Sequence, residues 1–412
     1  MHPVAWLLWF LLGLLLATAA GFYLQRRARR RRAGSTTSLR YFTGLRYLLD
    51  EQPDEALTVF LRLADENPEI VEIQLAVARL FRRKGELERS IRIHQNLVAR
   101  TQLDRKDRLT ALYELACDYL SAGLYDRAER LFNELLEDKP WRRPALTQLI
   151  QIHENQKDWD DALRSAHALE QASGMSYGRV MAHYECEMGL VALETRDLRE
   201  ARERIGRALR KDPESVRAHW MMGKVFWLEN RPAQAYPLFE QAFRLKPLLA
   251  PVTLRELWVA TAAIQPRGGL QKVLRKAMLD DNAKDAVAQA LILDPSSPVT
   301  DWAECLHDFL DRHTVLKSFC PSGSGEAWAL RVRESLAPIF RLTLRFYCEE
   351  CGYSLHAHVW KCPGCHRWDS FLPHEILEEQ LGSLEKNRPT VLFDYPGLHA
   401  RPSRLTNPRS WQ

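Results

Sequence analysis

The sequence lacks the short motifs that mark the common kinds of catalytic site. It has no GxGxxG or P-loop for a nucleotide, no HExxH for a catalytic zinc and no GxSxG for a serine nucleophile. A net positive charge is also absent outside one segment, because the formal net charge is +5 and an arginine run over 26–32 accounts for that excess. A near-neutral body lacks the distributed basic surface that a nucleic-acid backbone requires. These absences argue against an enzyme and against a nucleic-acid partner.

Cysteine is sparse over most of the chain. Four of the 8 cysteines are widely spaced, at Cys117, Cys186, Cys305 and Cys320, and the other four lie within 348–365. A secreted protein stabilised by disulfides would be smaller and more evenly supplied with cysteine. The clustering therefore predicts metal ligation in a reducing compartment.

Charged residues are absent from Val4 to Leu24, immediately before the arginine run. As a helix this stretch would be about 31 Å long, which matches the hydrocarbon core of a bilayer. A cleaved signal peptide would carry positive charge before the apolar run, and the first three residues carry none. We predict a membrane anchor over 1–24 and a basic juxtamembrane segment over 25–36. The positive-inside rule places the N-terminus outside and the body in the cytosol.

A pattern with a period of about 34 residues recurs over 37–250. Glycine repeats at this interval from Gly189 to Gly223, and proline repeats from Pro213 to Pro247. Small residues let two helices cross closely, aromatic residues fill the groove to the next unit, and proline ends the second helix. The pattern resembles the tetratricopeptide repeat. It predicts six units, which begin at Thr37, Val71, Leu109, Arg143, Ala182 and Val216.

The phase of the repeat fades after the sixth unit. Residues 251–335 still place apolar residues at helical spacing, for example at Leu254, Leu257 and Trp258, but glycine and proline interrupt the pattern. We predict divergent helical repeats in this region. The fold class is therefore all-α, with an N-terminal transmembrane helix, a tetratricopeptide-repeat solenoid and a small C-terminal module.

The most specific chemical motif is a pair of CxxC sequences. Cys348 and Cys351 are followed, after ten residues, by Cys362 and Cys365. Two residues between paired cysteines let both sulfurs converge on one ion, and the ten residues suffice for a hairpin that brings the pairs together. Four thiolates form a tetrahedral site suited to zinc or to a single iron, with two disulfides as the alternative. A closed ligand shell leaves no place for an activated water, so we predict a structural metal site and no catalytic residue.

Residues 340–373 resemble a rubredoxin-like metal-binding domain. Gly352, Tyr353 and Pro363 accompany the four cysteines as they do in rubredoxin knuckles. His366 stands where the second knuckle usually has glycine, and the module is shorter than a free rubredoxin. These departures put electron transfer in doubt and leave metal binding in place.

Two histidines lie between the cysteine pairs, and a C-terminal segment follows them. Because four cysteines already close the shell, we expect His356 and His358 to lie at the surface or around the ligands. Residues 374–386 predict one helix, and the proline-containing remainder of 374–412 is expected to be disordered.

The order of anchor, arginine run, repeats and knuckles is similar to that of the lipopolysaccharide assembly protein B family of Gram-negative bacteria. Residues 80–82, 90–95, 122–129 and 347–368 carry the resemblance. It implies an inner-membrane adaptor that regulates proteolysis of the LpxC deacetylase by the FtsH protease, with these two proteins and other membrane proteins as partners. It also implies a single pass with a periplasmic N-terminus, and a rubredoxin-type iron, with zinc equally allowed by the ligands.

Two other functions stay open at this point. A rubredoxin-type redox carrier would use iron and give a reversible one-electron signal. A different membrane-anchored tetratricopeptide scaffold would share the architecture and have other partners. A homo-oligomer is compatible with all three.

Overall fold

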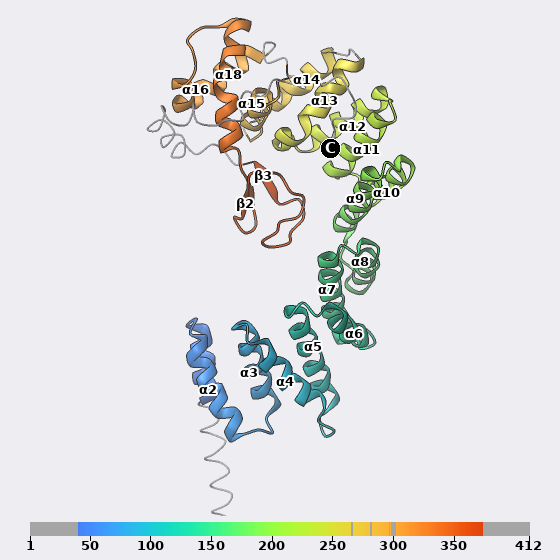
Figure 1. Cartoon of the computed structure of the whole chain (residues 1–412), viewed down its shortest axis with the longest axis vertical. Coiled ribbons are helices and arrows are strands. Elements are labelled where there is room, and N and C mark those ends of the chain that lie inside the picture. The colour runs from blue at the N-terminus through green and yellow to red at the C-terminus, as the bar shows by residue number, and fades with distance from the viewer. Residues whose placement is uncertain (1–39, 265–266, 281, 296, 298–301, 374–412) are drawn as a thin grey trace, which may run out of the picture. The chain divides into compact units, whose positions relative to one another are not determined.

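The structure is a computed structural model that describes residues 40–373, apart from 265–266, 281, 296 and 298–301 (Figure 1). The predicted membrane anchor, the basic segment and the predicted C-terminal helix and tail lie outside the described residues. The chain separates into two compact units, Met1–Ser173 and Gly174–Gln412, which are called unit 1 and unit 2 below.

Unit 1 consists of consecutive helix pairs. Its described part begins with a helical segment over 40–49, which pairs with α2. The remaining pairs follow at short connections, as the repeat pattern predicts. The helices are α2 (Pro53–Glu66), α3 (Val71–Arg83), α4 (Leu87–Val98), α5 (Arg105–Ser121), α6 (Tyr125–Leu135), α7 (Lys139–Gln156) and α8 (Trp159–Ser173).

Unit 2 begins with two further pairs and continues into a less regular helical region. The pairs are α9 (Gly178–Glu194) with α10 (Leu198–Lys211), and α11 (Val216–Leu228) with α12 (Pro232–Leu245). A short 3-10 helix η1 (Pro247–Leu249) follows, and then α13 (Ala250–Ile264), α14 (Arg267–Met278), α15 (Lys284–Leu293), α16 (Ala303–Arg312), α17 (Thr314–Ser318) and α18 (Gly325–Thr343). The predicted solenoid is thus observed in both units.

In two of the helix pairs, close crossing depends on a glycine in the first helix. A Cβ added at Gly44 would lie 2.8 Å from the Phe60 ring, and one added at Gly223 would lie 2.6 Å from the Phe239 ring. Both phenylalanines are almost completely buried. Real Cβ atoms do not approach ring carbons this closely, so the two helices touch at these positions only because the side chain is absent.

One helix in the described part of the chain is long and apolar enough to cross a membrane, namely Pro247–Ile264. Half of this segment is buried inside unit 2. Leu257 and Ala260 are fully buried in a core that also contains Leu274 and Leu291 of neighbouring helices. Packing in that core accounts for its apolar composition.

The C-terminal module is a three-stranded antiparallel sheet of order β2-β1-β3, formed by β1 (Phe346–Cys348), β2 (Ser354–Leu355) and β3 (Phe371–Pro373). We call residues 346–373 the ribbon. The hairpin differs from the expected one, because β1 and β2 pair Phe346 with Leu355 and so enclose the first knuckle. An isolated bridge between Lys361 and Trp368 encloses the second knuckle in the same way. Each cysteine pair therefore has its own turn, and no hairpin spans the ten residues between the pairs.

Candidate metal centre

Each cysteine pair sits in a tight turn that closes on its first cysteine. The backbone N–H of Gly352 donates to the Cys348 carbonyl at 2.9 Å, and the N–H of His366 donates to the Cys362 carbonyl at 2.9 Å. Gly352 has a φ of 73° and His366 a φ of 61°, so both adopt the left-handed conformation. Glycine adopts it without strain, whereas the histidine has a Cβ to accommodate. The second knuckle therefore keeps its turn despite the substitution noted in the sequence.

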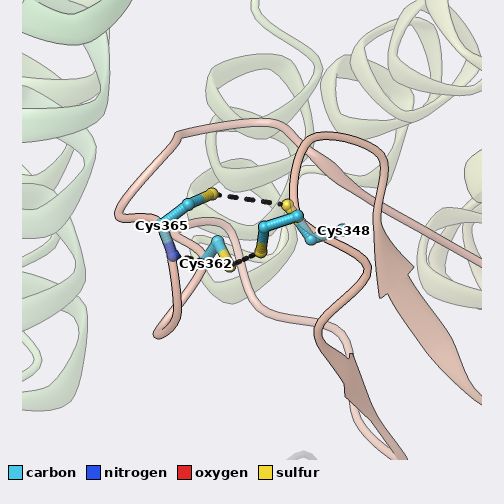
Figure 2. Close-up of side chains that lie close together, drawn as sticks. Cys348, Cys362 and Cys365 are labelled. Atoms are coloured by element: carbon cyan, nitrogen blue, oxygen red, sulfur yellow. Dashed lines mark hydrogen bonds between the residues drawn. The ribbon is translucent and has the colours of Figure 1, made fainter. Parts of the chain in front are cut away.

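The turns bring the four cysteine sulfurs together. All four Sγ atoms lie within 4.8 Å of one another. The Cys348 and Cys365 sulfurs are 3.6 Å apart, as are those of Cys351 and Cys362, and Figure 2 shows three of these side chains converging from the two knuckles. A tetrahedral site with Zn–S bonds of about 2.3 Å has sulfurs about 3.8 Å apart. The spacing thus fits one tetrahedrally bound metal ion.

Hydrogen bonds favour thiolates in this cluster. The Cys362 sulfur accepts the backbone N–H groups of Gly364 at 3.3 Å and Cys365 at 3.4 Å. At Cys348, burial raises the thiol pKa, but the Ser370 hydroxyl and the amides of Cys351 and Glu350 outweigh it and lower the pKa to about 6. Donors aimed at sulfur stabilise the charged form, which is the form that binds a metal.

The same cluster is short of positive charge. The backbone amide of Arg367 lowers the pKa of the Cys365 thiol, but burial and the three neighbouring sulfurs outweigh it and raise that pKa to about 12. Four thiolates at this spacing repel one another, so they ionise together only around a cation. The donor set and its charge therefore fit one metal ion. Both Zn(II) and a single iron accept four thiolates.

The two histidines of the ribbon behave differently from each other. His356 is exposed, whereas His358 is half-buried and packs edge-on against the rings of Phe346 and Trp360. Burial lowers the pKa of His358 to about 4, which keeps the ring neutral near pH 7. In the described part of the chain, neither histidine joins the cysteine cluster.

The ribbon is docked on the repeats of unit 2 through His183 of α9. The His183 side chain is 1% exposed, and its Nε2 lies 2.7 Å from Oδ2 of Asp369. Its ring stacks on Trp368 with the centroids 4.6 Å apart. Burial raises the pKa of Asp369, but its hydrogen bond and electrostatic interaction with His183 and the nearby Lys246 ammonium lower it overall.

Arg217 of α11 makes a second contact with the ribbon. Its side chain is 3% exposed and forms an ion pair with Glu187 at 2.8 Å. The guanidinium lies over the Trp360 ring at 5.7 Å and over the Trp368 ring at 6.0 Å. A buried arginine between a carboxylate and two aromatic faces replaces part of its hydration by ionic and cation–π contacts.

The sequence predicted that the four cysteines come together, but it did not predict the docking site. All four predicted cysteines are brought together, because their spacing is local. The sequence did not single out His183, Arg217 or Asp369. The two residues in the repeats are far from Asp369 in the sequence, and His183 precedes it by 186 residues, so no local pattern connects them. Two tryptophans, at 360 and 368, were the sequence feature that could have indicated a docking surface. They flank the second knuckle, and a module this small has too little core of its own to bury both side chains.

Comparison with known families agrees with both parts of the chain. Residues 346–373 match the family described as the rubredoxin metal binding domain. Residues 43–102, 113–176 and 186–249 match the tetratricopeptide repeat. The chain thus combines repeats with a metal-binding ribbon, as the sequence predicts.

Curated relatives match nearly from end to end. Lipopolysaccharide assembly protein B of Escherichia coli K12 is 30% identical over 387 residues, which cover 89% of this chain and 99% of the relative. The protein of that name from Haemophilus influenzae is 27% identical, over 87% of this chain and 96% of the relative. Among solved structures, MamA from Desulfovibrio magneticus RS-1 is 19% identical and covers 43% of this chain and 94% of its own, with a TM-score of 0.29.

Proposed function

Because the chain belongs to the lipopolysaccharide assembly protein B family, we propose that it is a non-catalytic adaptor in lipopolysaccharide assembly. The observation that carries the proposal is the match over 99% of the Escherichia coli relative, which spans repeats and ribbon alike. Tetratricopeptide stacks present extended surfaces to other proteins, and this is the role expected of an adaptor.

We propose further that the adaptor acts on enzyme turnover. It binds the LpxC deacetylase and the membrane protease FtsH, so that LpxC is degraded when lipopolysaccharide is sufficient. The predicted span over 4–24 anchors it in the inner membrane with the N-terminus in the periplasm and the body in the cytoplasm. The anchor keeps the repeats beside membrane-bound partners.

For the metal centre we propose Cys348, Cys351, Cys362 and Cys365 as the ligands of one ion. The rubredoxin resemblance favours iron, and zinc fits the same four thiolates. The bound ion fixes the two knuckles relative to each other. The residues around it then hold Trp368 and Asp369 against α9 and α11, which is a structural role.

The adaptor proposal is tested by depleting the protein and following the half-life of LpxC. We expect LpxC to persist several-fold longer after depletion, and the wild-type chain supplied in trans to restore its turnover. A strain lacking FtsH activity is the matched control, because depletion should change nothing there. An unchanged LpxC half-life on depletion would refute the proposed mechanism and leave a different scaffold.

One observation favours a redox carrier as the second candidate. Cys351 is exposed in an otherwise partly buried cluster, so one ligand sulfur faces solvent, where an electron-transfer partner would approach. The candidate predicts iron in the purified protein and a reversible one-electron signal. Zinc in the native protein, or an iron form without such a signal, rules it out.

A further inference from the structure

The segment that carries Asp369 and Ser370 joins the cysteine cluster to the repeats. The carboxylate of Asp369 contacts His183 of α9, and the Oγ of Ser370 lies 3.3 Å from the Sγ of Cys348. Both members of the second contact are buried, since Cys348 is 1% exposed and Ser370 is 6% exposed. Two consecutive residues thus contact two different parts of unit 2, namely a helix of the repeats and a ligand of the proposed metal centre.

The hydroxyl of Ser370 has one proton and two acceptors within reach. It donates to the carbonyl of Arg367 at 3.2 Å, while the thiol of Cys348 donates to its oxygen. A metal ion binds the thiolate, so the thiol proton leaves and only the hydroxyl proton remains between oxygen and sulfur. A hydroxyl rotates to the stronger acceptor, which is then the charged sulfur. The Arg367 carbonyl keeps the N–H of Cys362, which donates to it at 2.8 Å, so this rotation leaves no acceptor unpaired.

The backbone beside Ser370 is held in an uncommon conformation. Asp369 has a φ of 56°, in the left-handed region that aspartate enters at a small cost. Within the ribbon, its N–H donates to the Trp360 carbonyl at 2.8 Å, and the N–H of Glu349 donates to the Ser370 carbonyl at 2.9 Å. The side chain of Asp369 adds a contact from outside the ribbon, at the buried ring of His183. Docking on α9 therefore helps to hold the conformation that places the hydroxyl beside the sulfur.

We propose that Ser370 is a positioning residue of the metal centre, whose hydroxyl stabilises the Cys348 thiolate and is kept in place by the contact between Asp369 and His183. Metal binding and docking of the ribbon are then coupled, and each strengthens the other by the same factor. A hydrogen bond to a ligating sulfur changes both the affinity for the ion and the electronic state of the site. The inference rests on the proposed cysteine ligands, and it is independent of the adaptor function and of the choice between iron and zinc.

The first test measures the Zn(II) affinity of the purified full-length chain by competition with a chelator. Ser370→Ala should lower the affinity about ten- to hundredfold, which is the usual effect of removing a group that supports a metal ligand. Ser370→Thr keeps the hydroxyl and should retain most of the affinity. Ser354→Ala is the matched control, because Ser354 is exposed on β2 of the same sheet, and it should leave the affinity unchanged.

A spectroscopic measurement separates this role from general support of the fold. With Co(II) as the probe, the sulfur-to-metal charge-transfer band reports the electron density on the ligating sulfurs. Loss of the hydrogen bond raises that density, so Ser370→Ala should move the band to longer wavelength and Ser370→Thr should move it back. A tetrahedral Co(II) spectrum in each variant shows that the ribbon is still folded.

The coupling to the repeats is tested at His183. His183→Ala removes the partner of Asp369 and should lower the Zn(II) affinity about three- to tenfold, with a band shift in the same direction as in Ser370→Ala. Asp369→Asn weakens the contact from the other side and tolerates the left-handed backbone, so its result stands even where His183→Ala perturbs α9. In the Ser370→Ala background, His183→Ala should lower the affinity by less than about twofold, because the effect passes through the hydroxyl. His356→Ala is the control, since His356 is exposed on the ribbon, and it should change neither property.

Three results would overturn the inference. Unchanged affinity and spectrum in Ser370→Ala would show that the hydroxyl does not act on the site. A loss of affinity without a band shift would show that the serine only supports the fold. Full additivity of His183→Ala and Ser370→Ala would show that docking acts on the metal by another route. A wild-type chain that binds no Zn(II) or Co(II) would instead refute the proposed metal centre itself, so the two failures are distinguishable.

Discussion

Asp118 is completely buried in unit 1 and is contacted by side chains from two neighbouring helices. Its carboxylate accepts from Arg82 of α3 and from the Ser90 hydroxyl of α4, both at 2.7 Å, and Nδ1 of His94 lies 2.6 Å away. Arg82 also pairs with Glu114 at 2.6 Å, and Glu114 pairs with Arg79 at 2.7 Å, so two arginines face two carboxylates. A single side chain on α5 thus ties two successive repeats together.

Replacing Asp118 should therefore be costly. Asp118→Ala removes the buried carboxylate that Arg82, the Ser90 hydroxyl and His94 share, and we expect the free energy of unfolding to fall by about 3–5 kcal/mol. Chemical denaturation of the purified chain measures the change. Asp65→Ala is the control, because Asp65 is exposed on α2 and should cost less than about 0.5 kcal/mol. Equal effects of the two substitutions would contradict the assigned role.

Glu114 makes the stability of unit 1 depend on pH. Burial raises its pKa, but hydrogen bonds and charges from Arg79 and Arg82 outweigh burial and lower it. A carboxyl with a depressed folded pKa stabilises fully above its unfolded pKa of about 4.3, and the contribution is lost as the pH falls through the folded pKa. Protection factors for hydrogen exchange in α3 and α5, which correct for the intrinsic effect of pH, should fall below about pH 4. In Glu114→Gln this acid dependence should be weaker, and an unchanged profile would refute the assignment.

These residues show how far a single sequence leads. Residues 80–82 and 90–95 carried the family resemblance, but the role of Arg82, Ser90 and His94 was not visible. The repeat pattern accounts for Ser90 only as a small residue at a helix crossing. Its hydroxyl bonds to Asp118, which lies in the next repeat, and periodicity does not reveal a contact of that kind.

Helix crossings were predicted for the right physical reason. The 34-residue spacing identified small residues at the crossings, and the structure places Gly223 directly against Phe239. The repeat pattern did not predict how closely the two helices approach each other at a given crossing. Alanine fits at other crossings of the same solenoid, so the pattern alone does not show where only glycine fits. The gap depends on the partner, which here is a buried phenylalanine.

Two glycine substitutions separate packing from helix propensity. Gly223→Ala places a methyl group on the Phe239 ring, and we expect a loss of about 1–3 kcal/mol in unfolding free energy. Gly206→Ala on α10 meets nothing closer than 3.8 Å, so it should stabilise by about 0.5–1 kcal/mol. Thermal denaturation of both variants gives the comparison. A stabilising Gly223→Ala would show that the helices can move apart at little cost.

In the ribbon, the contacts within each knuckle could be predicted from the sequence, whereas the contacts with distant helices could not. Its four sulfurs followed from spacing alone, because CxxC turns are local. Its attachment to α9 depends on His183 and Asp369, which are 186 residues apart. No local pattern connects them, and only the folded chain brings them together.

Loss of the metal should therefore release the ribbon. The double variant Cys348→Ser with Cys351→Ser removes two thiolates, and we expect metal content to fall to background and hydrogen exchange over 346–373 to rise at least tenfold. Exchange in α9 around His183 should rise with it, while α3 and α5 of unit 1 remain unchanged. Metal analysis and exchange mass spectrometry measure these effects. Full metal retention in the double variant would contradict the assigned ligands.

The proposed function of the whole molecule depends on its attachment to the membrane as much as on the binding surface of its repeats. The repeats and ribbon are described by the structure, whereas the predicted anchor lies outside it. Hydropathy alone supports the anchor, and it is a strong signal because 4–24 carries no charge and an arginine run follows. The partners of the repeats and ribbon were inferred from family membership, because the repeat pattern reports how the helices pack and not which protein binds their surface.

Removing residues 1–24 tests the importance of location. We expect the shortened chain to appear in the soluble fraction and to restore LpxC turnover poorly in depleted cells, because its local concentration beside membrane partners falls. Replacing the segment by an unrelated single-pass span of the same orientation should restore turnover. Normal turnover with the soluble form would show that the anchor is dispensable.

The contact between His183 and Asp369 also has a mechanical consequence. Repeat stacks contact only their neighbours and can unravel from either end. Here the start of unit 2 is tied to its C-terminal ribbon, so the intervening chain forms a closed loop. A pull on the C-terminus must first detach the ribbon before any repeat can peel away. The contact between the ribbon and α9 therefore sets the force at which unit 2 begins to unravel, and the metal ion that we propose would strengthen it by holding the ribbon folded.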